Sequence, residues 1–283
     1  MFLLKHFLQT SKFVLGVVTA TILLTPAPTY AEVKTAESGQ VKAQISYQPG
    51  ANGTYKNQRL KIIRAGQTVL DTALPVESEY DRPLFKDGND GFPAGFQVQN
   101  IDKVSEPEII TDFYTGGAHC CIYSLIYGYK PDKKQYSQIK HFWGNGGYSF
   151  RDLDQDGTPE FYSRDDRFAY AFTSYAASAY PLQVWQYRDG KMLDVTRQYP
   201  RQIYDNAYQL WKLFEEQRKA GIDPQGLNVK GILAAYLGDK YLLGQGEDGW
   251  KRVRQVYKLS NREQYFSDLQ KFLQENGYTA NSR

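Results

Sequence analysis

Phe150-Arg-Asp-Leu-Asp-Gln-Asp-Gly-Thr-Pro-Glu-Phe161 places three aspartates at alternate positions and follows them with a glycine and a glutamate. A tightly curved loop can turn alternate carboxylates to one side, and glycine permits the sharp bend that such a loop needs. Hard oxygen ligands of this kind suit Ca²⁺, which takes roughly six to eight of them. The sequence therefore predicts a structural calcium loop with five ligand residues: Asp152, Asp154, Asp156, Thr158 (through its backbone carbonyl) and Glu160.

The residues on either side of this loop indicate strands. Tyr148 and Phe150 alternate with a serine before the loop, and Phe161 and Tyr162 follow it. An EF-hand would need flanking helices and a bidentate glutamate at the twelfth loop position, where this chain has Ser163. The stretch instead resembles the Asp-x-Asp-x-Asp-Gly-x-x-Asp/Glu hairpins of FG-GAP and VCBS repeats. That resemblance implies calcium held between two β-strands, in a unit that those families repeat to build propellers.

A second stretch aligns with the first without a gap, at an offset of 52 residues. It runs over residues 98–109 and matches the later copy, residues 150–161, at an aspartate, a proline and a glutamate: Asp102 with Asp154, Pro107 with Pro159, and Glu108 with Glu160. Val104 and Ser105 replace the third aspartate and the glycine, so we expect no tight calcium site in the first copy. The match predicts a duplicated strand–loop–strand unit.

Strand patterns come before helix patterns along the chain. From residue 41 to about 187, short alternating or β-branched runs are separated by turn signals such as Ala65-Gly66-Gln67. Leu182 to Tyr187 is a strand candidate that ends at Asp189-Gly190. Phe168, Tyr170 and Phe172 alternate with alanines, which predicts a further strand with aromatic side chains on one face.

Beyond Pro200 the hydrophobic residues recur at helical spacing in four segments. The last segment has a Ser260–Glu263 capping box at its start and Gly277 at its end. The order predicts an α+β fold. Its antiparallel β-rich part, residues 32–198, would form partial propeller- or sandwich-like sheets, and residues 199–283 would form a bundle of about four amphipathic helices. The pattern leaves open whether the helices are a separate domain.

The first 31 residues have the order of a secretory signal peptide. Lys5 and Lys12 give a basic start, Phe13 to Leu24 is apolar, and Ala31 ends a small-residue cleavage site. A retained membrane anchor would need a longer apolar run, of roughly 18 residues. We therefore expect export to the periplasm or the extracellular space, with no membrane insertion after cleavage.

Cleavage would remove two of the 34 basic residues and none of the 31 acidic ones, which leaves the mature chain nearly neutral. A nearly neutral chain has no electrostatic attraction for nucleic acid. Phosphate loops, dinucleotide fingerprints and the common hydrolase motifs are also missing from the sequence.

Thr115-Gly-Gly-Ala-His-Cys-Cys121 contains both cysteines of the chain. Adjacent cysteines cannot connect distant segments, so they form either a strained vicinal disulfide or two buried thiols. A histidine can activate a thiol, which makes His119, Cys120 and Cys121 weak catalytic candidates. A metal site with Asp112 and His119 is a further alternative. The plainest interpretation is a tight glycine turn that leads into a buried strand.

With Pro107-Glu108 before it and Asp165 to Tyr175 after it, this string resembles a family of exported bacterial proteins of unknown function. The resemblance covers residues 41 to about 208 and implies no activity. Our leading hypothesis is an exported, non-catalytic module of unknown role that binds a protein or glycan partner. The alternative is a cell-envelope hydrolase or thiol-dependent enzyme that uses His119, Cys120 and Cys121.

Overall fold

The computed structural model describes residues 31–85, 95–104, 106–117 and 121–279. Within them, antiparallel sheets are followed by four helices, which confirms the predicted α+β fold. Three of the sequence predictions lie outside the described residues: the signal peptide up to residue 30, and the side chains of His119 and Cys120.

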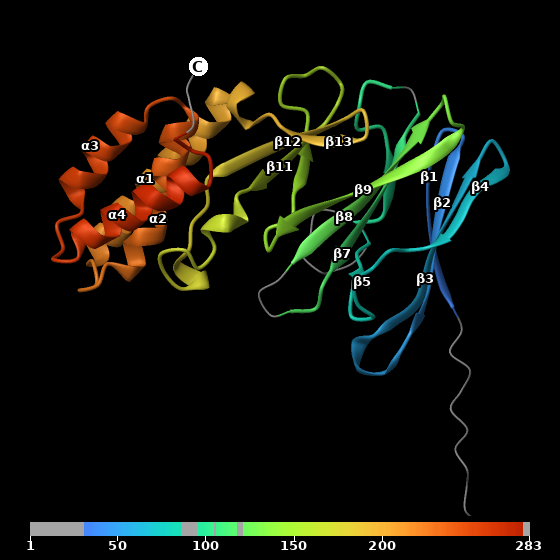
Figure 1. Cartoon of the computed structure of the whole chain (residues 1–283), viewed down its shortest axis with the longest axis horizontal. Coiled ribbons are helices and arrows are strands. Elements are labelled where there is room, and N and C mark those ends of the chain that lie inside the picture. Colours follow the sequence, from blue (N-terminus) through green and yellow to red (C-terminus); the bar gives the residue numbers. More distant parts are fainter. Residues whose placement is uncertain (1–30, 86–94, 105, 118–120, 280–283) are drawn as a thin grey trace, which may run out of the picture.

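The strands form three sheets in chain order, and Figure 1 shows them following one another along the long axis. The first sheet contains β1 (Glu32–Ser38), β2 (Val41–Pro49), β3 (Tyr55–Arg64) and β4 (Gln67–Ala73). The second contains β5 (Arg82–Pro83), β6 (Gln97–Gln99), β7 (Glu108–Tyr114), β8 (Ile122–Lys130) and β9 (Gln135–Gly144). The third contains β10 (Ser149–Arg151), β11 (Glu160–Arg164), β12 (Leu182–Arg188) and β13 (Lys191–Asp194).

Two predicted turns connect the strands of hairpins in these sheets. Ala65 and Gly66 both have positive φ angles, 47° and 79°, between β3 and β4. Asp189 and Gly190 do the same, at 52° and 78°, between β12 and β13. A two-residue hairpin turn with positive φ at both positions matches the twist of the strands that it joins. The turn signals in the sequence are thereby confirmed.

The aromatic run after β11 does not form a strand, so that prediction was wrong. Short 3₁₀ helices occupy Asp166–Phe168 and Tyr175–Ala177, and Tyr170 lies between them with a φ of 59°. Phe168 is buried against Phe272 and Tyr278 of the C-terminal part. Phe168 is therefore covered by the C-terminal part without strand pairing, whereas Tyr170 is 55% exposed.

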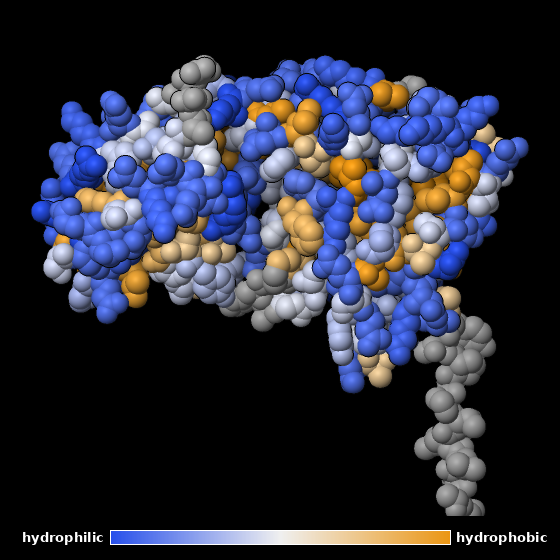
Figure 2. Space-filling model, in the orientation of Figure 1, coloured by the Kyte–Doolittle hydropathy of each residue, from blue (hydrophilic) through white to orange (hydrophobic). Residues whose placement is uncertain are grey.

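The helices are α1 (Pro200–Ala220), α2 (Leu227–Leu242), α3 (Gly246–Val256) and α4 (Arg262–Glu275). They form the end of the molecule opposite β1–β4 (Figure 1). Helix α2 is buried along most of its length, whereas the outer surface of the helical end is mainly hydrophilic (Figure 2). No helix among the described residues is long and apolar enough to cross a membrane.

The structure confirms the predicted C-terminal end of α4 but not its predicted N-terminal cap. Gly277 follows the helix with a φ of 79°, as predicted, and the backbone N–H of Tyr278 donates to Leu273. The predicted capping box was wrong, because the N-cap is Asn261 and no side chain caps the helix there. The Asn261 side chain instead donates to the carbonyl of Gln225 and accepts from the hydroxyl of Tyr257. Contacts with Tyr257 and with the loop at Gln225 thus replace the predicted cap.

The buried carboxyl group of Asp239 connects helix α2 to the third sheet. Asp239 accepts hydrogen bonds from the backbone N–H of Leu182 at 3.0 Å and from Nδ2 of Asn206 at 2.7 Å. These bonds join β12, α1 and α2. A hydrophobic cluster beside them contains residues of β12 together with Tyr199 and Ile203, so the start of α1 packs directly on the sheet.

Candidate functional site

The two acidic stretches lie in equivalent hairpins. Gln99 pairs with Glu108 between β6 and β7, and Arg151 pairs with Glu160 between β10 and β11. The same offset of 52 residues relates both pairs and the whole register of the two hairpins. Each loop therefore begins at the equivalent residue of its own hairpin, and each ends at the glutamate.

The glutamates close the base of each loop in the same way. Oε2 of Glu160 accepts a hydrogen bond from the backbone N–H of Leu153 at 2.8 Å. Oε2 of Glu108 accepts one from the backbone N–H of Ile101 at 3.1 Å. Both glutamates are buried. Satisfying an N–H at the start of the loop fixes the path that the chain takes through the turn.

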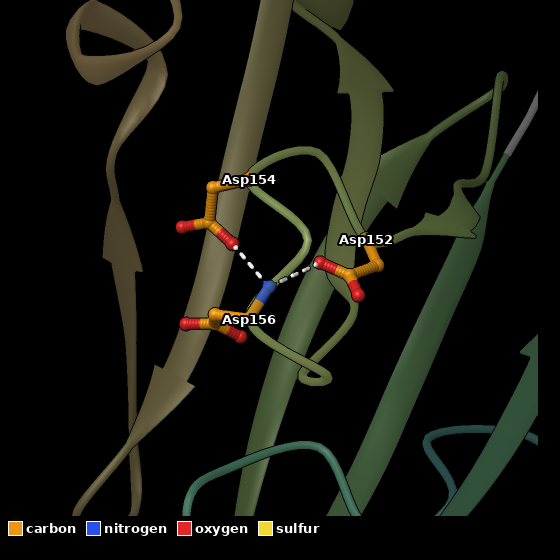
Figure 3. Close-up of side chains that lie close together, drawn as sticks. All are labelled: Asp152, Asp154 and Asp156. Carbon is orange, nitrogen blue, oxygen red and sulfur yellow. Dashed lines mark hydrogen bonds between the residues drawn. The ribbon is translucent and has the colours of Figure 1, made fainter.

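The three aspartates of the second loop come together at its exposed end. One oxygen from each of Asp152, Asp154 and Asp156 lies within 4.8 Å of the other two. Figure 3 shows the backbone nitrogen of Asp156 between two of these carboxylates; it donates to Asp152 at 3.1 Å and to Asp154 at 3.2 Å. Gly157, with a φ of 86°, donates to the second oxygen of Asp152. The loop thus curls around its own carboxylates.

Thr158 and Glu160 lie outside this group of three carboxylates. The backbone N–H of Thr158 donates to Asp156 at 2.8 Å. Both oxygens of Glu160 are engaged below the loop, one by Leu153 and the other by Nε2 of Gln186 at 2.7 Å. The structure therefore gathers three of the five predicted ligand residues at the loop end and places Glu160 at its base.

A lysine from the first loop contacts the second. Nζ of Lys103 lies 2.8 Å from Oδ2 of Asp156, and this hydrogen bond is the main cause that lowers the pKa of Asp156. Between the two loops is a pocket of 320 Å³ lined by Lys103, Val104, Asp156 and Thr158, among others. The lysine offsets part of the negative charge that the aspartates concentrate.

The first loop keeps one turn of the second, because Val104 donates to Asp102 as Asp156 donates to Asp154. Asn100 accepts from the N–H of Asp102 at 3.2 Å, and Asp102 accepts from the N–H of Val104 at 2.7 Å. Val104 occupies the position of Asp156 and is 48% exposed. The first loop therefore presents an apolar side chain where the second presents a carboxylate.

Two residues of the site were missed by the sequence reasoning. Nε2 of Gln186 donates both to Glu160 and, at 3.2 Å, to the hydroxyl of Tyr199, the residue directly before α1. Burial, aided by the neighbouring carboxylates, raises the pKa of Tyr199, which keeps its hydroxyl protonated. Nothing in the sequence near either residue signals this contact, because both lie far from the loop along the chain.

The cysteine string begins as a tight turn. The backbone N–H of Cys121 donates to Oγ1 of Thr115, and the N–H of Thr115 donates back to the carbonyl of Cys121. Gly116 has a φ of 85°, and the buried strand β8 follows directly at Ile122. Cys121 is disulfide-bonded. Its sulfur is therefore not a free thiol in this structure.

Asp112, which was considered as a metal ligand, has structural partners, and the ring of His141 likewise packs against its neighbours. Asp112 is fully buried and accepts hydrogen bonds from the hydroxyls of Ser124 and Tyr148. The ring of His141 lies 4.2 Å from that of Trp143 and 4.6 Å from that of Trp185. Burial lowers the pKa of His141 to about 4.

Comparison with known proteins gives relatives whose names state no activity. Residues 203–277, which span most of the four helices, match the family model described as the sll0997 C-terminal domain. The chain is 30% identical over 225 residues to the probable thylakoid lumen protein sll0997 of Synechocystis sp., a match that covers 78% of this chain and 62% of that protein. It is 25% identical over 236 residues to the uncharacterized protein y4bJ of Sinorhizobium fredii, covering 79% of this chain and 33% of that protein.

The chain thus spans less than two thirds of the length of either relative. No solved structure matches it. The fold and the loop define an α+β protein with two hairpins of equivalent register, of which the second gathers three carboxylates.

Proposed function

We propose that this protein is an exported, non-catalytic module in which Ca²⁺ stabilises the β10–β11 loop and which binds a protein or glycan partner. The observation that carries the calcium proposal is the convergence of Asp152, Asp154 and Asp156 at the end of one hairpin. Three like charges this close repel one another, and a divalent cation removes that repulsion more completely than the single ammonium of Lys103.

The ligands in this proposal come from the loop itself. The three aspartates supply carboxylate oxygens, and Thr158 supplies its backbone carbonyl. Glu160, the fifth predicted ligand residue, contributes chiefly by fixing the loop through Leu153 and Gln186. Water would complete the coordination shell, as is usual for calcium in exposed loops.

Export is supported by the signal-peptide pattern of the first 31 residues and by the name of one relative, a probable thylakoid lumen protein. We propose a periplasmic or extracellular location on these grounds. Expression of the whole chain in a bacterial host, followed by fractionation and N-terminal sequencing, tests it. We expect a periplasmic product that begins at Glu32; a cytoplasmic product that retains residues 1–31 would refute the proposal.

The non-catalytic part of the proposal is supported by the engagement of the candidate groups. Asp112 is enclosed by structural partners, and Cys121 is disulfide-bonded. The alternative enzyme, a thiol-dependent one or a cell-envelope hydrolase, needs His119 with Cys120 or Cys121. Thiol titration of the purified protein discriminates between them: a rapidly reacting thiol without added reductant favours the enzyme, and its absence favours the module.

Calcium titration by calorimetry is the direct test of the metal site. We expect one saturable site that is lost in Asp154→Ala and in Asp156→Ala. Asp102→Ala is the matched control, because Asp102 holds the position of Asp154 in the first loop, where we expect no tight site. No binding by the unmodified protein, or equal loss in Asp102→Ala, would contradict the proposal.

A further inference from the structure

A second feature of the molecule, separate from the acidic loop, is a pocket of 540 Å³ where the third sheet meets α1. The loop at residues 145–148, the end of β11, the start of β12 and Asn206 of α1 form its walls. Arg164 alone is charged among the described residues that line it; neutral polar groups such as Asn145, Tyr162 and Tyr180 supply much of the rest. The pocket therefore has a single positive charge.

The guanidinium of Arg164 is held in place from two sides. Its Cζ lies 4.4 Å from the ring centroid of Tyr180. On the other side, a Cβ atom on Gly146 would come within 2.2 Å of Nε of Arg164, so the backbone of the loop lies directly against the guanidinium. Side chains fixed before a ligand arrives lose little conformational entropy on binding.

Arg164 has no anionic partner within the described part of the chain. Its Nε is buried without a hydrogen-bond acceptor, and its guanidinium takes part in none of the ion pairs there. Asp166 is near enough to interact with it electrostatically but forms no ion pair with it, and burial raises the pKa of that carboxyl. Other arginines of the fold, Arg64 and Arg167, are paired with carboxylates. The pocket is therefore lined by a guanidinium that forms no ion pair with a described carboxylate, and an anionic ligand can supply the missing partner.

We propose that this pocket binds a carboxylated sugar, with the carboxylate on the guanidinium of Arg164. A planar guanidinium suits the two oxygens of a carboxylate. The amides of Asn145 and Asn206 and the hydroxyls of Ser149 and Tyr162 suit the hydroxyl groups of a sugar ring. The volume lies within the range of small-molecule sites. This inference rests on the proposed function as a binding module, since it names the kind of glycan bound.

Binding of D-glucuronate to the whole exported chain, measured by calorimetry, tests the proposal, with D-glucose and inorganic sulfate as comparison ligands. We expect saturable binding of glucuronate, none of glucose, and weakening of at least tenfold in Arg164→Gln. Arg254→Gln is the matched control, because Arg254 also stacks on an aromatic ring, Trp250, but lies on α3 and does not line the pocket.

Gly146→Ala is a second variant that keeps the charge. Its new Cβ displaces the guanidinium, so we expect weakened glucuronate binding and no further loss when it is combined with Arg164→Gln. Thermal melting of each variant verifies that it folds. Equal binding of glucose or sulfate, or equal losses in Arg164→Gln and Arg254→Gln, would overturn the proposal. If the unmodified protein binds calcium but not glucuronate, this inference alone is refuted. If the unmodified protein binds no calcium, the metal-site proposal is refuted.

Discussion

The hydroxyl of Tyr199 lies 3.4 Å from Oδ2 of Asp154, so the residue that precedes the first helix contacts the end of the acidic loop. The same hydroxyl accepts a hydrogen bond from Gln186, which also holds Glu160 at the base of the loop. One tyrosine thus connects the top of the loop, its base and the start of the helical part.

Removing this hydroxyl should weaken the connection without disturbing the packing of the ring. We expect Tyr199→Phe to lower the free energy of unfolding by about 1 kcal/mol, the usual net contribution of a buried hydrogen bond. Urea unfolding measures this. Tyr204→Phe is the control, because Tyr204 lies on α1, is 59% exposed and makes no side-chain hydrogen bond among the described residues. Equal effects of the two substitutions would contradict the prediction.

The two loop-closing glutamates should respond differently to the same substitution. Burial raises the pKa of Glu108 to about 8, so it is mostly protonated at neutral pH and glutamine is a close substitute. Both oxygens of Glu160 accept hydrogen bonds, so an amide NH₂ there would face a donor. We expect Glu160→Gln to cost about 2 kcal/mol and Glu108→Gln less than about 1 kcal/mol at neutral pH. Chemical denaturation of both variants measures the difference, and a larger cost for Glu108→Gln would refute this explanation.

Asp239 should make stability fall as the pH rises. Burial raises its pKa to about 8, whereas an unfolded aspartate titrates near about 3.9. Between these values the folded protein binds a proton that the unfolded chain lacks, so the contribution is complete below about pH 4 and is lost as the pH approaches about 8. We expect Asp239→Asn to flatten this slope, by up to a few kcal/mol across the interval. Urea unfolding at several pH values in this range tests it, and an unchanged slope would count against it.

His141 should make the stability of the fold decrease as the pH falls. Burial lowers its pKa to about 4, whereas an unfolded histidine titrates near about 6.5. The unfolded chain therefore binds the proton first, and stability that is complete above about pH 6.5 is lost as the pH falls toward about 4. His141→Phe keeps an aromatic ring beside Trp143 and Trp185 and removes the titration. We expect a shallower loss of melting temperature on acidification, and an identical acid profile would contradict this.

Lys103 should compete with a metal ion for Asp156. Its ammonium occupies one carboxylate oxygen of the loop but is itself 71% exposed, so a cation can displace it. We expect Lys103→Met to raise the affinity for Ca²⁺ a few-fold, because the competing charge is gone. Lys271→Met, which removes an exposed charge on α4, is the control for net charge. Unaltered affinity in Lys103→Met would show that the lysine does not compete.

Local signals in the sequence were sufficient for many elements. Positive-φ turn residues at Ala65-Gly66 and Asp189-Gly190 fix two hairpins, and the spacing of hydrophobic residues after Pro200 indicates four helices. The convergence of Asp152, Asp154 and Asp156 also follows from their spacing, because neighbouring residues of one tight loop cannot lie far apart.

Contacts between distant segments decided what the sequence did not show. Phe168 and Phe172 alternate as a strand would, but the helices of the C-terminal part supply their packing surface. Asn261 caps no helix because its side chain is engaged by Tyr257 and Gln225. Tyr199 joins the site from 45 residues beyond Asp154. The spacing of neighbouring residues in the sequence does not indicate contacts with such distant partners.

The ion pair between Lys103 and Asp156 joins the two copies of what the sequence alignment shows as a duplication. The first copy has Val104 where the second has its third carboxylate, and its Lys103 supplies a positive charge to that carboxylate. The charges of the two loops are therefore complementary. A substitution in either loop changes the charge balance of the other, so the stability of each loop depends on the sequence of both.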